Sequence, residues 1–239
     1  MFENQGSERS IIIIGDLHGR NIWKDIVALH PADSIVFLGD YFDSKENISA
    51  PEQINNFNEI LHFKRQNPSR VTLLMGNHDF HYLPQAGETY SGYQRFFHND
   101  IWEAIEPAFT GGDLQVCMQA GEYLISHAGL TRTWCFLHDI PFNAPMDPVN
   151  ELMVSNVRAL AFSPGPIFEK SGDEPQQGPL WVRPDSLKKD ALPGFIHVVG
   201  HTQQPDIRFY PDVIIVDVFS FSPKYLLIMP DGQAIIRSL

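Results

Sequence analysis

Three apolar segments in the first third of the chain each run into a glycine that is followed by a polar side chain. The first, 11–14, is four consecutive isoleucines, a composition typical of a strand that is buried on both faces. The other two are 34–38 and 71–75. Residues 21–29 and 51–66 lie between them with the apolar spacing of amphipathic helices. This alternation predicts a largely parallel sheet covered by helices.

The polar side chains after these strands are of types that bind metal ions. Asp16 and His18 follow the first strand, Asp40 follows the second and Asn77 follows the third. Residues i and i+2 of an extended chain point the same way, so Asp16 and His18 are expected to converge on one point. In α/β architectures, sites lie beyond the carboxyl ends of the strands. We therefore predict one site at this edge.

Two later strands each lead into a histidine. Residues 123–126, which we expect to pair with 114–118 in a hairpin, precede His127, and residues 195–199 precede His201. Carboxylate, amide and imidazole ligands together suit manganese, iron or zinc, whereas calcium does not favour imidazole. The five strand ends therefore predict a transition-metal site.

The size of this ligand set favours two metal ions, about 3.5–4 Å apart. The first ion is assigned Asp16, His18 and Asp40, and the second is assigned Asp40, Asn77, His127 and His201. Such a pair polarises a phosphoryl oxygen and lowers the pKa of a bridging water, and the resulting hydroxide can attack phosphorus in line. The expected cofactors are two divalent cations, manganese first, with iron or zinc as alternatives.

These residues lie in five short motifs that follow one another along the chain: Gly-Asp-Leu-His-Gly at 15–19, Gly-Asp-Tyr-Phe-Asp at 39–43, Gly-Asn-His-Asp at 76–79, Ser-His-Ala-Gly-Leu at 126–130 and Gly-His-Thr at 200–202. In combination they resemble the calcineurin-like metallophosphoesterases, over about residues 10–220. The resemblance implies an α/β (α+β) fold, a four-layer α/β/β/α sandwich of mixed sheets flanked by helices. It also implies a dinuclear metal site at the strand ends.

Many members of that superfamily end in Gly-His-x-His, but Gln203 stands at the second histidine position here. The chain therefore looks like the phosphoprotein phosphatase branch, which includes bacterial and phage serine/threonine phosphatases and symmetrical diadenosine tetraphosphate hydrolases. In that branch the histidine of Gly-Asn-His is the general acid, and the second aspartate of Gly-Asp-x-x-Asp is its partner. These positions are His78 and Asp43. A carboxylate partner would keep the imidazole charged and oriented to protonate a leaving alkoxide.

The segment after Asp43 departs from the branch. Its members usually continue with Arg-Gly, and that arginine binds the substrate phosphate, whereas this chain continues with Ser44 and Lys45. A lysine does not reproduce the bidentate fork of arginine. Residues 180–183 resemble the Leu-Trp-x-Arg of bacterial relatives, so Arg183 is assigned to the substrate phosphate together with Asn77.

Length and composition describe an ordinary globular protein. The 239 residues fit one metallophosphoesterase domain, 1–239, with 130–190 as a cap-like excursion over the site. The formal net charge of −12 argues against a partner that is a nucleic-acid polymer, and no apolar run approaches the length of a membrane span. Residues 1–9 do not resemble a signal peptide, and the two cysteines suit a reduced compartment. We therefore expect a cytoplasmic protein without a membrane partner.

Several residues outside the motifs have roles that the sequence leaves open. His81 lies close to the Gly-Asn-His-Asp turn and is the first candidate for a further role, whereas the other five histidines without motif context are assigned to surface or core. Asp217 could support a metal ligand or occupy a surface turn. Helices are also expected at 92–105 and 149–162, the first with a core face of aromatic residues: Tyr93, Phe96, Phe97 and Trp102.

These observations favour a hydrolase over other classes of protein. A phosphorylated protein or a small phosphomonoester is the leading substrate, and a dinucleoside polyphosphate is the alternative. A nuclease is less favoured because the acidic chain has no basic track. A non-catalytic binding scaffold with the same fold ranks last, because such a protein would have lost metal ligands.

Overall fold

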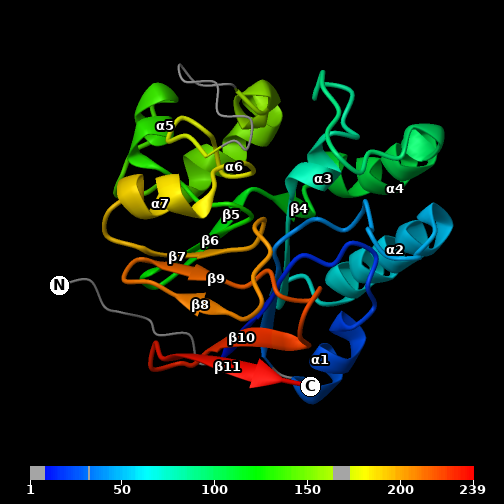
Figure 1. The fold of residues 1–239 in the computed structure, drawn as a ribbon, viewed down its shortest axis with the longest axis horizontal. Helices are drawn as coiled ribbons and strands as arrows, with labels where there is room; N and C mark the ends of the chain where they lie inside the picture. Colours follow the sequence, from blue (N-terminus) through cyan, green and yellow to red (C-terminus); the bar gives the residue numbers. More distant parts are fainter. Residues whose placement is uncertain (1–8, 32, 164–172) are drawn as a thin grey trace.

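The computed structural model describes residues 9–31, 33–163 and 173–239. Most of the segment 1–9, on which the expectation about a signal peptide depends, lies outside the described residues. Two β-sheets face each other in the middle of the molecule, and helices cover their outer faces (Figure 1). Among the described residues, no helix is both long and apolar enough to cross a membrane.

The first sheet has six strands in the order β11-β10-β1-β2-β3-β4. Its centre, β1 to β3, is parallel as predicted, and β4 continues the parallel set. Strands β10 and β11 add an antiparallel hairpin beside β1, so the sheet is mixed. The strands are β1 (Ile11–Ile14), β2 (Ser34–Phe37), β3 (Val71–Leu74), β4 (Leu114–Gln115), β10 (Lys224–Ile228) and β11 (Ala234–Ser238).

The second sheet has five strands in the order β5-β6-β7-β9-β8 and is also mixed. They are β5 (Cys117–Ala120), β6 (Tyr123–Ser126), β7 (Ile196–Val199), β8 (Arg208–Phe209) and β9 (Val213–Ile215). The predicted strand 114–118 is wrong as a single element. Its first two residues pair with β3 in the first sheet, and only the part from Cys117 onward pairs with β6. The chain passes between the sheets at Val116, which is fully buried.

The alternating side chains of β1 explain why this strand is apolar throughout. Ile11 and Ile13 pack into the core between the two sheets, where they meet Ile125, Val198 and other residues of the second sheet. Ile12 and Ile14 point the other way, into the core beneath the helices that cover the first sheet. Those helices are α1 (Trp23–Leu29), α2 (Ala50–Gln66) and α4 (His98–Thr110).

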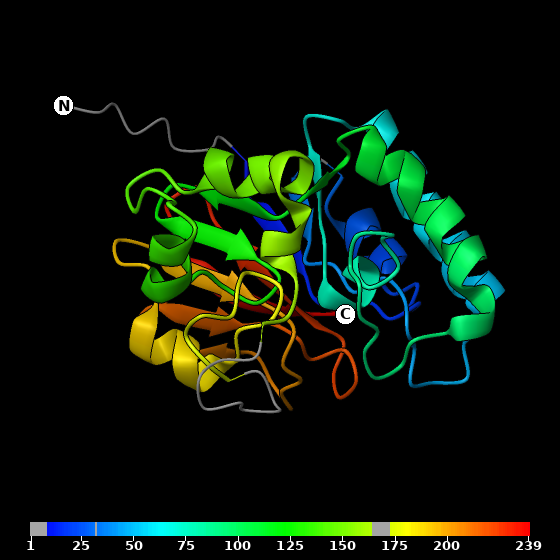
Figure 2. The same cartoon turned by 90° about the horizontal axis from the view of Figure 1, so that it is seen from above.

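Other helices cover the outer face of the second sheet, on the opposite side of the molecule from α2 and α4 (Figure 2). Leu187 packs on Val199 and Ile215 of that sheet. The helices are α5 (Arg132–Leu137), α6 (Met146–Ser155), the short 3-10 helix η2 (Val157–Leu160) and α7 (Pro184–Asp190). The four-layer α/β/β/α sandwich predicted from the family resemblance is therefore confirmed. The helices within 130–190 form its outermost layer on this side.

The expected helix at 92–105 begins later than predicted. A short helix α3 (Asn77–Phe80) follows β3, and a 3-10 helix η1 (Arg95–Phe97) precedes α4. As a result, the aromatic residues do not all face the core. Phe96 is 96% exposed and Phe97 is 38% exposed, whereas Tyr93 and Trp102 pack against the core. The α-helical period does not apply to a segment that is not α-helical, and Phe96 and Phe97 therefore lie at the surface.

His197 provides a stability prediction, because it is buried in β7 and pairs its Nε2 with the carbonyl of Leu192 at 3.1 Å. Burial lowers the pKa of His197, so the unfolded chain takes up a proton first as the pH falls below about 6.5. The free energy of unfolding should therefore fall with decreasing pH. His197→Gln should reduce that dependence, measured by chemical denaturation at about pH 7.5 and about pH 5.5. The exposed control His62→Gln should behave like the wild type.

Candidate metal centre

The candidate site lies where the chain leaves the carboxyl ends of β1, β2, β3, β6 and β7. Four residues of the site have a positive φ, an uncommon backbone conformation for residues other than glycine. They are His18 (46°), Asp40 (53°), Asp43 (61°) and His201 (62°). Such conformations persist only where the surroundings enforce them, and they concentrate at functional sites. Sharp turns at the strand ends therefore direct these side chains.

Two glycines give the carboxylates the space they occupy. A Cβ on Gly76 would lie 2.1 Å from Oδ1 of Asp40, and a Cβ on Gly200 would lie 2.1 Å from Oδ1 of Asp16. Any larger residue would displace the carboxylate at either position. Gly76 is therefore needed to leave space for Asp40, and Gly200 is needed to leave space for Asp16, each of which belongs to another motif.

Asp16 and Asp40 are both buried, at 1% and 2% exposure. The backbone N–H of His201 donates to Oδ2 of Asp16, but among the described residues Oδ1 of Asp16 has no hydrogen-bond partner. Burial, together with the Asp217 and Asp40 carboxylates, raises the pKa of Asp16 well above its usual range. A bound cation would compensate this crowding of negative charge and supply the missing partner. The donor set thus fits a metal ion.

Asp217 is buried beside Asp16, so it does not lie at the surface. Burial and the neighbouring Asp40 carboxylate raise the pKa of Asp217 to about 7. The surface turn is therefore wrong, and Asp217 adds a further carboxylate behind Asp16.

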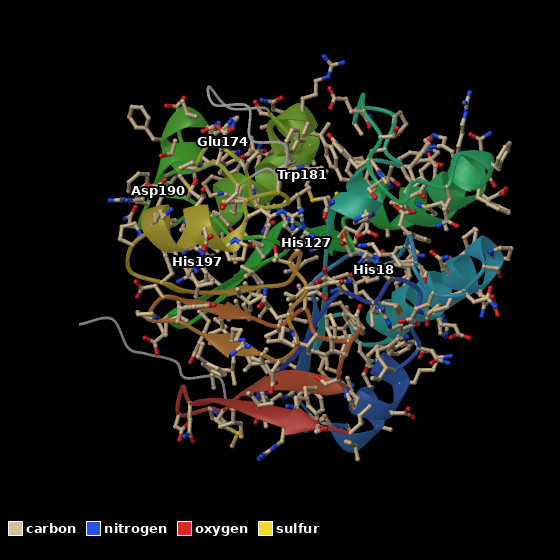
Figure 3. The ribbon with its side chains drawn as sticks, in the orientation of Figure 1. His18, His127, Glu174, Trp181, Asp190 and His197 are labelled. Atoms are coloured by element: carbon tan, nitrogen blue, oxygen red, sulfur yellow. The ribbon has the colours of Figure 1, made fainter. Side chains whose placement is uncertain are left out.

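Backbone carbonyls select which ring nitrogen of each histidine is available. Nδ1 of His18 lies 2.7 Å from the carbonyl of Phe42, and Nδ1 of His127 lies 2.8 Å from that of Leu38. Each of these nitrogens must therefore carry the proton, which leaves Nε2 as the ligand atom. The two Nε2 atoms lie 3.6 Å and 3.5 Å from the Asp40 carboxylate. Figure 3 shows His18 and His127 near the centre of the molecule.

His201 uses the opposite nitrogen. Its Nε2 lies 3.1 Å from the carbonyl of Trp181 and donates to it, so in the neutral ring Nδ1 carries no proton. Nδ1 lies 2.9 Å from Oδ1 of Asn77. Nε2 of His127 reaches the same Asn77 oxygen at 2.9 Å. Burial lowers the pKa values of His18, His127 and His201, which keeps them neutral, the form that binds metals. All six predicted ligands are thus brought together.

Asp79, to which no role was assigned from the sequence, organises the turns beneath these ligands. Its carboxylate accepts the backbone N–H groups of Gly76, Asp40 and Tyr41 at 2.8–2.9 Å. These groups belong to the turns that follow β2 and β3, so one side chain ties two strand ends together. The signal was present in the sequence, because Asp79 is the fourth residue of the Gly-Asn-His-Asp motif.

Asp43 and His78 form a pair next to the ligand cluster. Nδ1 of His78 donates to Oδ2 of Asp43 at 2.8 Å, and the ring of His78 lies 5.2 Å from that of His18. Burial opposes the charged form of His78, but the Asp40 and Asp43 carboxylates outweigh it and raise the pKa of His78. The predicted dyad therefore exists, with the imidazole biased toward its protonated form.

Arg183 and Lys45 are the two cations considered as phosphate ligands, and they lie in different settings. Arg183 is partly buried, and its Nη1 donates to Oγ1 of Thr202 at 3.3 Å, next to His201. Its charge also acts on the pKa values of His127 and His201. Lys45 is exposed. Of the two, Arg183 has a hydrogen bond beside His201, whereas the charge of Lys45 partly opposes the rise in the pKa of Asp217.

A family model described as calcineurin-like phosphoesterase matches residues 9–205. The chain belongs to that family. The match includes all five motifs on which the resemblance was based. Family membership and the buried group of Asp16, Asp40 and His127 together suggest the use of divalent metal ions.

Two curated relatives are named as phosphatases. A candidate serine/threonine-protein phosphatase of Schizosaccharomyces pombe is 25% identical over 181 residues, covering 66% of this chain and 57% of that protein. A protein phosphatase 2A catalytic subunit from Dictyostelium discoideum is 25% identical over 128 residues, covering 51% of this chain and 38% of that protein. The chain spans about half the length of these relatives. Their names support the phosphoprotein phosphatase branch.

Solved structures show the same fold at low sequence identity. A cold-active protein tyrosine phosphatase superposes with a TM-score of 0.64 at 18% identity, covering 96% of this chain and 79% of that one. A protein serine/threonine phosphatase from Saccharomyces cerevisiae gives a TM-score of 0.59 at 15% identity, with the same two coverages. Both confirm the sandwich architecture.

Asp40→Asn should lower the metal content of the protein, because both Nε2 ligand atoms converge on this carboxylate. The substitution removes a negative charge that would neutralise the bound cations, and it keeps the size of the side chain. Mass spectrometric metal analysis of protein dialysed against manganese measures the effect. Asp212→Asn, on the exposed surface, serves as control. An Asp40→Asn protein that retained the wild-type metal content would contradict this role.

Proposed function

We propose that this protein is a metal-dependent phosphatase that hydrolyses phosphate esters. The observation that carries the proposal is the Asp43–His78 pair, an acid with a carboxylate partner, held beside a buried cluster of metal-ligand side chains. Family membership and the names of the relatives agree with this activity.

Two divalent cations would be held by the predicted ligands. The first would take Asp16, His18 and Asp40, and the second would take Asp40, Asn77, His127 and His201. When bound, such ions polarise the phosphoryl group and lower the pKa of a water molecule, which makes it a nucleophile. Manganese is the expected metal, with iron or zinc as alternatives.

His78 is proposed to protonate the leaving group. Its Nδ1 is committed to Asp43, so the proton available for transfer is on Nε2. The side chain of His78 is 15% exposed whereas that of Asp43 is fully buried, so only the imidazole of this pair can meet a substrate. Asp43 fixes the orientation of the ring and stabilises its charged form.

Arg183 is proposed to bind the substrate phosphate, together with Asn77. Partial burial strengthens the interaction of a guanidinium with an anion, and the planar fork can bind two phosphate oxygens at once. Arg183 immediately precedes α7, so the segment between α6 and α7 would contribute to substrate binding through this residue.

The leading substrates are a phosphoprotein and a small phosphomonoester. One relative is named as a serine/threonine-protein phosphatase and the other as a protein phosphatase, and one structural neighbour is named as a protein tyrosine phosphatase. A dinucleoside polyphosphate is the alternative, since the site also suits a phosphoanhydride. A non-catalytic scaffold is disfavoured because such a protein would have lost metal ligands, whereas this sequence keeps all six proposed ligands and His78.

The decisive test is His78→Asn. This variant should keep the metal content but slow turnover by about 10²–10⁴-fold on substrates with poor leaving groups, because general-acid catalysis is then lost. An activated aryl phosphate should be affected much less, since its leaving group needs no proton. Steady-state kinetics on phenyl and 4-nitrophenyl phosphate with manganese measure both effects. Equal rates for variant and wild type on phenyl phosphate would refute the assignment.

Arg183→Ala should raise KM for a phosphate monoester and weaken inhibition by inorganic phosphate, with a smaller effect on kcat. A charged hydrogen bond to the ligand contributes about 1.5–3 kcal/mol, so a change of about 10- to 100-fold is expected. Arg208→Ala is the matched control, because Arg208 lies exposed on β8. Unchanged phosphate inhibition in Arg183→Ala would show that another cation binds the substrate.

A further inference from the structure

Asp43 is held by more than its partner His78. Its Oδ2 accepts from Nδ1 of His78 at 2.8 Å and lies 2.7 Å from Nε2 of His81. Its Oδ1 accepts from the hydroxyl of Tyr82 and from Nε2 of Gln94, the latter at 3.2 Å. Oδ1 therefore has two donors, and Oδ2 has one donor and the close ring nitrogen of His81, so rotation of the carboxylate would break contacts at both oxygens.

His81 has a defined proton position in this arrangement. The backbone N–H of Tyr90 donates to its Nδ1 at 3.3 Å, so Nδ1 is an acceptor and the ring proton of the neutral form lies on Nε2. This nitrogen lies 2.7 Å from Oδ2 of Asp43, a close polar contact without the geometry of a hydrogen bond. Asp43, His78 and His81 have the composition of a metal site, but a protonated Nε2 cannot bind a metal. His78 therefore donates a hydrogen bond to Asp43, and His81 adds a close polar contact to the same carboxylate. Together with the bonds from Tyr82 and Gln94, these contacts form the Asp43 network.

The loop that precedes η1 closes over this network. A Cβ on Gly92 would lie 3.2 Å from Cβ of Asp43 and 3.5 Å from Cε1 of His78, so this part of the loop lies directly on the dyad. The ring of Tyr90 is parallel to that of His81, with centroids 6.0 Å apart. His81 thus touches Asp43 with one nitrogen and the loop with the other.

We propose that His81 is a positioning residue, which fixes Asp43 so that His78 is aimed at the leaving group. The inference rests on the proposed function of His78 as general acid. His81 is 2% exposed, behind Asp43, so it acts through the carboxylate without touching the substrate. A displacement of about 1 Å in such a group can lower a rate about 10²-fold, so anchoring the carboxylate matters as much as its charge.

The test compares His81→Phe, which keeps an aromatic ring but removes both polar contacts, with His81→Gln, which retains an N–H donor. On phenyl phosphate, kcat of His81→Phe should fall about 10-fold or more, whereas on 4-nitrophenyl phosphate it should change less than about 3-fold. His81→Gln should recover part of the loss. Metal content should match the wild type in both variants. An equal fall on the two substrates, or none, would overturn the proposal.

Tyr82→Phe provides a second variant if His81→Phe does not fold. It removes the hydroxyl that donates to Oδ1 of Asp43 while keeping the ring, and it should show the same dependence on leaving group, more weakly. Tyr93→Phe is its matched control, because the hydroxyl of Tyr93 pairs with Nδ1 of His98, outside the network. If Tyr93→Phe showed the same dependence on leaving group as Tyr82→Phe, the effect would come from general packing and the proposal would be contradicted.

A readout independent of turnover comes from proton NMR of the zinc-loaded chain. The imidazole N–H of His78 that bonds to Asp43 should resonate far downfield and be missing in His78→Asn. In His81→Phe it should shift or broaden. If the wild type hydrolysed no phosphate ester, the proposed function would be wrong. The NMR measurement would still show whether His81 positions Asp43 and His78. An unchanged resonance in His81→Phe would overturn the proposal.

Discussion

Buried carboxylates are the constraint on which the rest of this structure depends. Burying a charge is expensive unless other groups compensate it, and here each carboxylate is treated differently. Asp79 receives three backbone N–H groups, and Asp43 is surrounded by side-chain donors. Asp40 faces two imidazoles. Asp16 and Asp217 lie against further negative charge, and Oδ1 of Asp16 has no hydrogen-bond partner among the described residues, so this is where a cation is needed.

The geometry of the strand ends turns these charges into a site. Parallel strands end at one edge, and left-handed residues after β1, β2 and β7 direct the side chains of His18, Asp40 and His201 inward. The carbonyls exposed by the same turns fix the tautomers of the histidines. Backbone conformation, ligand direction and ligand protonation thus follow from one local feature that recurs at several strands.

Much of this was predictable from the sequence. Ile11 to Ile14 indicate a doubly buried strand, and the Gly-Asp and Gly-His pairs indicate the ligands, because local patterns carry that information. Features that depend on contacts between distant parts of the chain could not be predicted from the sequence. Nothing local says that the chain changes sheets at Val116, or that Phe96 lies outside while Tyr93 packs inward. His81 and Asp217 were flagged only by proximity to a motif or a strand, since their partners lie far away in sequence.

The bonds of Asp79 have a consequence for how ions exchange. They join the turns after β2 and β3, which carry Asp40 and Asn77, through groups that do not involve the ligand atoms. The ligand frame is therefore preorganised by the protein itself. A domain of this kind differs from a zinc finger, whose fold exists only with its metal. Metal ions bound at this site would therefore exchange while the sandwich stays intact, and supply and ligand chemistry rather than folding would determine which metal binds.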